Sequence, residues 1–301
     1  MKFTYRMNRP LIAFITADDP RDKRSWSGTN HFLYRTLEKH IGNVDILGPY
    51  TPQPLKFFCS AINFLTLRLL GKRFDYRHSF LMRNAYGKYF NDLLKKKNYD
   101  LAIVSASIAA AAGIKTSIPI VYINDRVIPG AMNYHKILTQ LFEFSKRQSI
   151  ACDKQAIKHS TVSVFSSHWA GNAAIELHGI DQRKIKVLPF GANFTERPPA
   201  PSTISFPEFP IRLLFVGVNW EDKGGQIAFD ALQEVLKNGI DAKLTIVGCS
   251  PPEGIQHPKM KVVGFLDKNI PDEAARLMDL FRKSHFFILP TKYEAYGLVF
   301  C

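Results

Sequence analysis

The chain has 301 residues, of which 46% are hydrophobic and 12% aromatic, and its formal net charge is +14. This composition excludes a disordered chain, because disordered sequences are poor in large apolar residues. The four cysteines show no C-x-x-C spacing, which excludes the usual cysteine patterns of structural zinc sites and secreted disulfide frameworks. The length predicts two domains, each with its own core.

The excess of positive charge lies in the first part of the chain. Residues 1–190 carry 28 Lys and Arg against 13 Asp and Glu, giving +15, whereas residues 191–301 carry 12 against 13, giving −1. Such asymmetry favours a polyanionic partner for the first part. An anionic membrane face, an acidic glycolipid and nucleic acid all fit this charge.

The first apolar run, residues 11–16 (LIAFIT), follows three basic residues, as in a signal peptide. It is only six residues long, and Asp18 and Asp19 follow it without a small-residue cleavage site, so we expect a buried first strand. No stretch reaches the roughly 18 apolar residues of a membrane span. We expect a cytoplasmic protein, a compartment that also fits the cysteine pattern.

Short apolar, β-branched runs alternate with longer helical patterns along the chain. The expected strands are residues 11–16, 44–48, 100–106, 119–124, 161–166, 184–190, 212–218, 242–248, 261–266 and 285–290. The expected helices are residues 29–40, 54–70, 79–97, 134–159, 167–178, 225–238 and 272–284. This alternation is typical of parallel sheets covered by helices on both faces, so the predicted fold class is α/β.

The alternation stops once, at residues 191–210, which contain five prolines and no clear period. We place a linker there. It separates an N-terminal Rossmann-like domain, residues 1–190, from a second Rossmann-like domain, residues 211–301. Ligands of open α/β sheets bind beyond the carboxyl ends of the strands, so two such domains facing each other would form a cleft.

Residues 212–235 carry the strongest candidate site. A strand ends at Gly217, and Lys223, Gly224 and Gly225 lead into an amphipathic helix. The glycines allow close approach to a ligand, the helix start offers N–H groups and Lys223 adds a full charge, so the stretch could bind a phosphate or diphosphate. An ordinary surface turn with a solvated lysine fits the spacing equally well.

A second candidate is the final stretch, PTKYEAYGLVFC, residues 290–301. It follows an expected buried strand, so Glu294 would lie at the carboxyl end of the sheet, where sugar or ribose hydroxyls could be bound. The alternative is a carboxylate that stabilises the start of a following helix through its dipole.

Together these stretches resemble the C-terminal domain of retaining glycosyltransferases of family 4, which have the two-Rossmann-domain GT-B fold. The resemblance rests on FVGVNWEDKGG (215–225), LTIVG (244–248), VVGFL (262–266) and PTKYEAYGL (290–298), in this order. Residues 165–194 resemble the family's passage from the N-terminal domain into the linker. The resemblance implies two domains facing a cleft and the transfer of a sugar from a nucleotide diphosphate sugar to a hydroxyl acceptor.

The family's donor motif is a glutamate, seven intervening residues and a second glutamate. Glu294 matches the first, and the chain ends one position before the second, so we expect a chain truncated within an incomplete second domain. The resemblance implies that Glu294 faces the donor sugar and that the backbone of Ala295, Tyr296, Gly297 and Leu298 lies close to the sugar or diphosphate.

The resemblance also assigns the donor-phosphate side. It implies that Gly217, Lys223 and Gly224 bind the donor, with Lys223 offsetting the charge of the departing diphosphate. Many relatives carry an arginine where this chain has Val218 or Asp222. Lys223 is therefore the only cation expected in this loop, and Asp222 would oppose a diphosphate unless it turns away.

In the first domain, Trp26-Ser27-Gly28-Thr29 lies between the first strand and the first helix and resembles the family's glycine-containing loop near the acceptor. Gly28 and Thr29 are the candidates for the acceptor side. An ordinary Ser/Thr helix cap is the alternative. Many relatives have a histidine after the strand 119–124, where Asp125 is the nearest polar candidate for a catalytic role; a strand-end turn former is its alternative.

Residues 54–97 contain ten basic and two acidic residues, interleaved with aromatic side chains. This composition suits an anionic membrane surface. It also suits two helices whose aromatic residues form core and whose cations are solvated. RNA is the third interpretation, but no recognisable nucleic-acid module accompanies the charge, so we expect no nucleic-acid partner.

These observations lead to one main expectation and two alternatives. The main expectation is a retaining glycosyltransferase of cell-envelope polysaccharide or glycolipid synthesis, peripheral to the inner face of the membrane. No acidic D-x-D pair or histidine pair indicates a metal site, so metal independence and no cofactor are expected. The alternatives are a truncated or decayed GT-B chain with a binding role, and a nucleotide-sugar epimerase of the same fold.

Overall fold

The computed structural model describes residues 9–132, 134–193 and 209–301. The chain forms two compact units: the first extends to Asn193 and also takes Ala295–Val299 and Cys301, and the second ends at Glu294 and also takes Phe300. Most of the predicted linker, residues 191–210, lies outside the described residues. The cleft expected between two domains stays a prediction.

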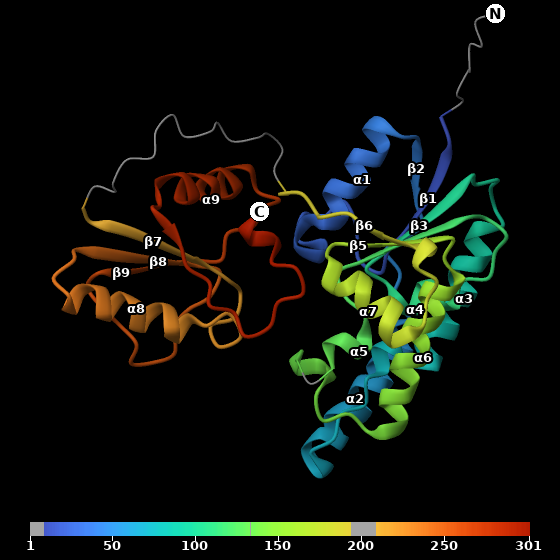
Figure 1. Cartoon of the computed structure of the whole chain (residues 1–301), viewed down its shortest axis with the longest axis horizontal. Helices are drawn as coiled ribbons and strands as arrows, with labels where there is room; N and C mark the ends of the chain where they lie inside the picture. The colour runs from blue at the N-terminus through green and yellow to red at the C-terminus, as the bar shows by residue number, and fades with distance from the viewer. Residues whose placement is uncertain (1–8, 133, 194–208) are drawn as a thin grey trace, which may run out of the picture. The chain divides into compact units, whose positions relative to one another are not determined.

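The first unit contains a six-stranded sheet in the order β2-β1-β3-β4-β5-β6, and all of its pairs are parallel (Figure 1). Its strands are β1 (Leu11–Ile15), β2 (Asn43–Ile46), β3 (Leu101–Ser105), β4 (Ile120–Asn124), β5 (Val162–Phe165) and β6 (Ile185–Val187). The chain places β2 on one side of β1 and β3 on the other. The sheet therefore has a topological switch point between β1 and β3, the usual place for a ligand.

Helices cover both faces of this sheet. They are α1 (Thr29–His40), α2 (Gln53–Leu70), α3 (Phe80–Leu94), α4 (Ile108–Gly113), α5 (Ile128–Ala131), α6 (Glu143–His159) and α7 (His168–His178), with 3-10 turns at Ser25–Gly28, Tyr76–His78, Lys136–Leu138 and Gln182–Lys184. Alternate residues of β1 face opposite ways: Ile12 and Phe14 pack with Leu33 of α1, whereas Ile15 belongs to the larger core that contains Phe90 of α3. Figure 1 shows α1 on one face and α3, α4, α6 and α7 on the other.

The second unit contains a four-stranded parallel sheet in the order β10-β7-β8-β9. Its strands are β7 (Ile211–Val216), β8 (Ala242–Val247), β9 (Met260–Gly264) and β10 (Phe286–Phe287). Helices α8 (Gly225–Lys237) and α9 (Pro271–Lys283) lie on opposite faces of the sheet, and a 3-10 turn covers Leu298–Phe300 (Figure 1). The switch point of this sheet lies between β7 and β10.

The predicted α/β class with parallel sheets is confirmed, and the helix expected at 29–40 is observed with these bounds. The helix expected at 134–159 is wrong in its first part, because α6 begins at Glu143. Leu138 and Leu141 are buried there, and Leu141 pairs with Arg73 in an isolated parallel bridge that replaces helical bonding. Helices α4 and α5 were not predicted. None of the described helices is long and apolar enough to cross a membrane.

Candidate functional site

The donor-side candidates Gly217, Lys223, Gly224 and Glu294 lie at the switch point of the second sheet. Strand β10 pairs in parallel with β7, so the segments that follow the two strands emerge at the same sheet edge. The backbone carbonyl of Asp222 joins these segments, because it accepts hydrogen bonds from the Lys292 N–H (2.9 Å) and the Thr291 hydroxyl (3.2 Å). The loop before α8 is therefore fastened to the stretch that carries Glu294.

The structure brings Lys223 and Glu294 together at this edge. Lys223 Nζ donates to Glu294 Oε2 at 2.6 Å, although the residues are 71 positions apart. The side chains are 26% and 30% exposed, so both groups are open to a ligand from solvent. The stem of the lysine lies across Gly217, where an added Cβ would come within 2.9 Å of Lys223 Cγ. Gly217 thus allows the lysine to reach the carboxylate.

The two glycines at the start of α8, Gly224 and Gly225, contact protein groups. Gly224 has a φ of 75°, and a Cβ at this position would overlap with the carbonyl oxygen of Pro290. A Cβ on Gly225 would overlap with the buried ring of Trp220. Close packing within the unit therefore already requires both glycines, and the expectation that they admit a ligand to the backbone stays a prediction.

The start of α8 offers hydrogen-bond donors at the same edge. Gly224 is the N-cap residue in a left-handed conformation, and no side chain caps the helix. The N–H of Gly225 donates to the carbonyl of Trp220 (2.7 Å), whereas the first-turn N–H groups of Gln226 and Ile227 have no intrahelical acceptor by geometry. These donors and Lys223 form a positively polarised position.

The other predicted donor residues, Ala295, Tyr296, Gly297 and Leu298, group with the first unit. The Tyr296 hydroxyl donates to the Phe190 carbonyl at 2.8 Å, and the two rings lie 5.3 Å apart. Gly297 has a φ of 79° and precedes the turn Leu298–Phe300. The contact of these four residues with a donor stays a prediction.

The acceptor-side candidates lie at the switch point of the first sheet. The buried Asn30 side chain joins three segments there: Asn30 Nδ2 donates to Ser25 Oγ (2.8 Å) and Thr16 Oγ1 (3.2 Å), and Ser105 Oγ donates to Asn30 Oδ1 (2.7 Å). Thr16 follows β1 and Ser105 ends β3. This network fixes the loop that contains the predicted Gly28 and Thr29.

That loop has an unusual backbone. Trp26, Ser27 and Gly28 have φ values of 47°, 59° and 98°, a run of left-handed residues in which the first two carry side chains. Backbone strain of this kind costs about 1–3 kcal/mol per residue and is concentrated at functional sites. Gly28 is the N-cap of α1 with no side-chain cap, so the Ser/Thr-cap alternative is wrong. Gly28 and Thr29 are both buried.

Asp125 contacts the same loop from the end of β4. Trp26 Nε1 donates to Asp125 Oδ2 at 3.3 Å. Asp125 Oδ1 is buried without a hydrogen-bond partner among the described residues, and the nearest recorded cation is Arg126 Nε at 4.0 Å. A buried carboxylate oxygen without a donor is costly, and a catalytic role or an ordered water molecule can account for one.

The position of Asp125 is fixed by its own strand. The Asp125 N–H donates to Asn124 Oδ1 (2.9 Å), and Asn124 Nδ2 donates to the Tyr122 hydroxyl (2.5 Å). Burial raises the pKa of the Tyr122 hydroxyl well above its usual range, so this group stays protonated. These hydrogen bonds hold the end of β4 and the backbone of Asp125 in place, which suits a catalytic or binding carboxylate.

The sequence missed two residues of this site. From the sequence, Trp26 is named only as part of the loop, and Asn30 is not singled out within the helix expected at 29–40. A polar residue in the first turn of a helix that follows a buried strand is the only available signal for Asn30. Among the described residues, no group of three or more His, Cys, Asp or Glu side chains could hold a metal ion. Metal independence stays a prediction.

No family model matches the chain, and no curated protein matches it. Among solved structures, it is similar to the S. aureus MnaA-UDP co-structure, with 12% identity, a TM-score of 0.50 and coverage of 92% of this chain and 73% of that one. TarM has 11% identity, a TM-score of 0.49 and coverage of 71% and 41%. A putative UDP-N-acetylglucosamine 2-epimerase from Listeria monocytogenes has 12% identity, a TM-score of 0.48 and coverage of 93% and 74%.

The similarity to MnaA concerns the fold, because the identity is only 12%. It supports a GT-B-like α/β fold for this chain. Membership of glycosyltransferase family 4 and retention of configuration stay predictions.

Proposed function

We propose that the protein is a glycosyltransferase that binds a nucleotide diphosphate sugar through Lys223 and Glu294. The observation that carries this proposal is the 2.6 Å contact between the two side chains at the switch point of the second sheet. A cation, a carboxylate and a helix start at one sheet edge suit a ligand that has both phosphate and hydroxyl groups.

Lys223 is proposed to bind the diphosphate. An ammonium group has three donors, so one can remain on Glu294 while another reaches a phosphate oxygen. As the bond between the sugar and the diphosphate breaks, negative charge grows on the departing phosphate, and a fixed cation at that position lowers the barrier. The first-turn N–H groups of Gln226 and Ile227 add polarity of the same sign.

Glu294 is proposed to orient the sugar. A carboxylate accepts several hydrogen bonds, so contact with Lys223 leaves capacity for sugar hydroxyl groups. The negative charge of Glu294 also favours the positive charge that develops at the anomeric carbon when the leaving group departs. The pair therefore assigns one residue to each end of the bond that breaks.

Asp125 is proposed to contact the reacting hydroxyl group. Its buried Oδ1 would accept a hydrogen bond from a sugar or acceptor hydroxyl, which would satisfy this oxygen. In the transfer, the acceptor oxygen bonds to the anomeric carbon, the bond from that carbon to the diphosphate breaks, and the acceptor proton moves to the departing diphosphate. Retention, a saccharide or glycolipid acceptor of the cell envelope and a cytoplasmic location belong to the same proposal.

Uridine diphosphate is the proposed nucleotide, supported by the fold similarity to the MnaA-UDP co-structure. Calorimetry with uridine and guanosine diphosphates tests this step. Tight binding of uridine diphosphate alone is expected. Absence of binding to either nucleotide would contradict the proposal and would favour a chain without catalytic function.

Product analysis tests the reaction itself. Incubation with a UDP-sugar and a pool of saccharide and lipid-linked acceptors is expected to give a glycosylated product. Conversion of the UDP-sugar to an epimer without acceptor would instead identify an epimerase. The variant Asp125→Asn is expected to lower kcat with little change in the affinity for uridine diphosphate, because Asp125 belongs to the acceptor side. Equal loss of nucleotide affinity would contradict this assignment.

A further inference from the structure

The helix α2 turns its apolar side outward. Its large hydrophobic residues are mostly exposed, with exposed fractions of 77% for Phe57 and 75% for Leu69. These outward residues recur at spacings of three, four and seven positions and therefore lie on one face, which we call the α2 face: Phe57, Phe58, Ala61, Phe64, Leu65 and Leu69. This pattern is the reverse of that of an ordinary surface helix.

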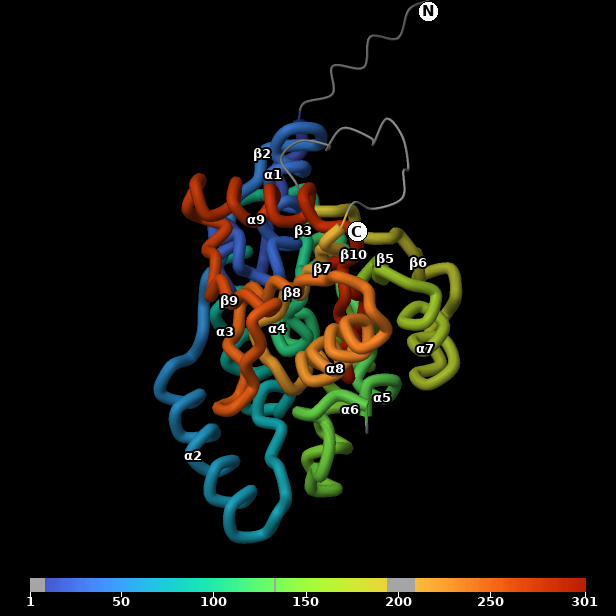
Figure 2. The backbone as a smooth tube through the Cα atoms, turned by 90° about the vertical axis from the view of Figure 1, so that its left-hand side faces the viewer, coloured from blue at the N-terminus to red at the C-terminus, as the bar shows by residue number. Residues whose placement is uncertain are grey.

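The inward side of α2 carries few large apolar residues. Cys59 is the buried residue of this helix, Leu55 packs partly buried against the core, and Asn63 Oδ1 accepts a hydrogen bond from the Phe74 N–H at 2.8 Å. Figures 1 and 2 both show α2 at the periphery of the first unit. Burial against the sheet therefore does not account for the phenylalanines. In α3, by contrast, Tyr86 and Phe90 are core, so the core interpretation of residues 54–97 holds for the second helix only.

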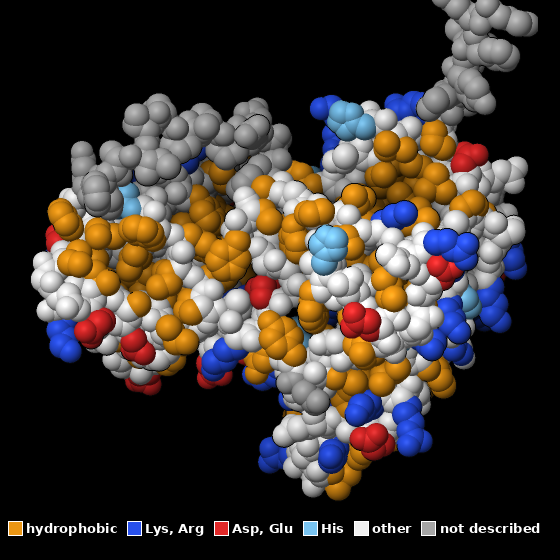
Figure 3. Space-filling model, in the orientation of Figure 1, with side chains coloured by type: hydrophobic (Ala, Val, Ile, Leu, Met, Phe, Trp, Pro, Cys, Tyr) orange, Lys and Arg blue, Asp and Glu red, His pale blue; other side chains and the backbone are white. Residues whose placement is uncertain are grey.

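The charged residues of α2 and of the segment that follows it are all basic. Residues 53–74 contain Lys56, Arg68, Lys72 and Arg73 and no acidic residue. The next carboxylate, Asp75, is buried and paired with His78 (2.7 Å) and Ser149 (2.7 Å). In Figure 3, hydrophobic side chains and Lys and Arg side chains gather at the lower tip of the first unit, and an acidic side chain lies among them.

We propose that the α2 face docks on an anionic lipid bilayer, with the helix lying in the plane of the interface. Its 18 residues span about 27 Å, so several phenylalanine rings can enter the interface together. Lys56 and Arg68 flank or interrupt the apolar face, and their long side chains can extend to the lipid phosphates. This proposal is independent of the proposed donor chemistry.

Charge complementarity favours a bilayer over a second copy of the chain. Two copies that met through this face would bring together surfaces that are both positively charged and hold no exposed carboxylate in residues 53–74. An anionic bilayer supplies the opposite charge and an apolar layer at once. Self-association through α2 is therefore an outcome that would contradict the proposal.

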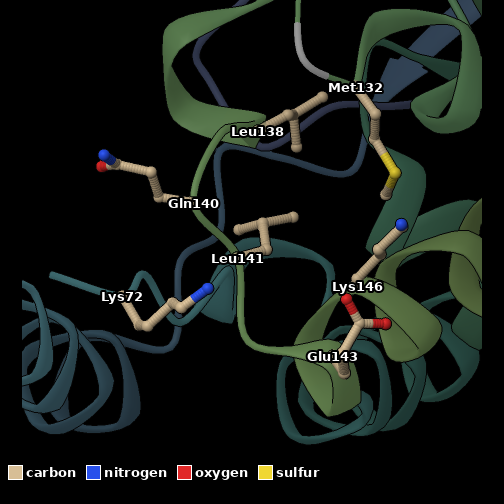
Figure 4. A pocket seen from close by; sticks show the side chains of 7 residues that line it. All are labelled: Lys72, Met132, Leu138, Gln140, Leu141, Glu143 and Lys146. Carbon is tan, nitrogen blue, oxygen red and sulfur yellow. The ribbon is translucent and has the colours of Figure 1, made fainter. Parts of the chain in front are cut away.

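A cavity of about 190 Å³ lies beside the end of α2. Lys72 and Lys146 line it with Glu143, Gln140 and the apolar residues Met132, Leu138 and Leu141. In Figure 4 the Lys72 amine points towards Leu141, while the Lys146 amine extends from α6 towards Met132. Two cations against one carboxylate give the lining a positive charge, which suits a lipid head-group phosphate next to the docked helix.

Flotation with vesicles tests the proposal in the full chain. Wild-type protein is expected to float with phosphatidylcholine–phosphatidylglycerol vesicles and to remain unbound with phosphatidylcholine alone. The triple change Phe57→Ser, Phe58→Ser, Phe64→Ser is expected to weaken binding tenfold or more, at about tenfold for each ring that enters the interface fully. Lys56→Glu with Arg68→Glu is expected to weaken it by about fivefold or more per cation.

Matched controls separate the α2 face from general charge and hydrophobicity. Lys95→Glu with Lys96→Glu makes the same charge change just after the C-terminal end of α3, away from the α2 face. This variant should bind the vesicles nearly as well as the wild type. Ile41→Ser with Leu177→Ser removes exposed apolar residues elsewhere in the first unit and should also bind as wild type. Circular dichroism is expected to be unchanged in all variants, because every replaced side chain is exposed.

A direct reading comes from Phe57→Trp, whose emission should shift to shorter wavelength when phosphatidylglycerol vesicles are added. Binding that ignores lipid charge, or that persists in the triple variant, would overturn the proposal. A dimeric wild type and a monomeric triple variant would also overturn it, because the α2 face would then be an interface between copies.

Discussion

Replacement of Lys223 by alanine removes the cation that contacts Glu294 in the proposed donor site. The change removes the ammonium that contacts Glu294 at 2.6 Å and leaves that carboxylate beside the proposed diphosphate position. A charge-assisted hydrogen bond contributes about 1.5–3 kcal/mol. Because the two side chains are 26% and 30% exposed, we take the lower part of this range, about 1.5–2 kcal/mol. The expected rise in Kd for uridine diphosphate is then about 10- to 30-fold.

Stability should respond far less than affinity, because a partly exposed ion pair contributes at most about 1 kcal/mol to folding. Calorimetry for the nucleotide and urea unfolding for the protein measure the two effects separately. Lys237→Ala is the matched control: Lys237 ends the same helix, α8, and pairs with Glu234 at 3.6 Å in a more exposed position. Its nucleotide affinity should equal that of the wild type.

The carboxylate partner should behave differently from the lysine. Glu294→Gln removes a negative charge close to the proposed phosphate position, so the affinity for uridine diphosphate should be at least as high as in the wild type. The rate of sugar transfer should fall. Unchanged nucleotide affinity in a stable Lys223→Ala protein would refute the reasoning. Equal losses in Lys223→Ala and Glu294→Gln would refute it too, because the pair would then act only as a structural link.

Three further predictions concern stability and reactivity. Gly224→Ala should cost about 2–5 kcal/mol in urea unfolding through strain and overlap, whereas Gly239→Ala, also at positive φ but with open space around it, should cost about 1–2 kcal/mol. Burial alone would raise the pKa of Asp75, but the His78 imidazole and the Ser149 hydroxyl lower it by more, so the pKa lies below its usual 3.8. Its stabilising effect is therefore complete above that pH, and the difference in unfolding free energy from Asp75→Asn should shrink as pH falls through the lowered pKa. Burial raises the pKa of Cys152 to about 12, so iodoacetamide should label exposed Cys301 long before Cys152, as read by mass spectrometry.

Hydrophobic periodicity predicted the elements that have one buried face. The 29–40 helix has apolar residues at helical spacing against the sheet, and its observed bounds agree. Helix α4 has the sequence IAAAAG and is buried almost all round, so it has no amphipathic period to detect. The 134–142 segment has a helical pattern, but the pairing of Leu141 with Arg73 is a long-range interaction that local sequence cannot reveal.

The candidate site, like the fold, could be predicted from the sequence only in part. The carboxyl ends of the expected strands predicted where Lys223, Glu294 and Asp125 would lie within their domains. The sequence could not predict that β10 lies beside β7, and this pairing is what brings Lys223 and Glu294 into contact. Asn30 was missed because its partners come from positions 14 and 75 residues away, and only the folded sheet brings them together.

The two units share one backbone feature near their switch points, a helix that begins at a left-handed glycine. Helices α1 and α8 each follow the first strand of their sheet, and each begins at a glycine N-cap, Gly28 or Gly224, with φ of 98° or 75°. Side-chain caps require the β conformation, so a left-handed N-cap leaves the first-turn donors without one. At α8 these donors lie beside Lys223. Near α1, Asp125 accepts a hydrogen bond from Trp26 through Oδ2, and its Oδ1 has no hydrogen-bond donor among the described residues. Donors without a cap beside a cation suit phosphate, and an acceptor without a donor suits a hydroxyl group, so the chemistry of each edge favours a different part of a sugar-transfer reaction.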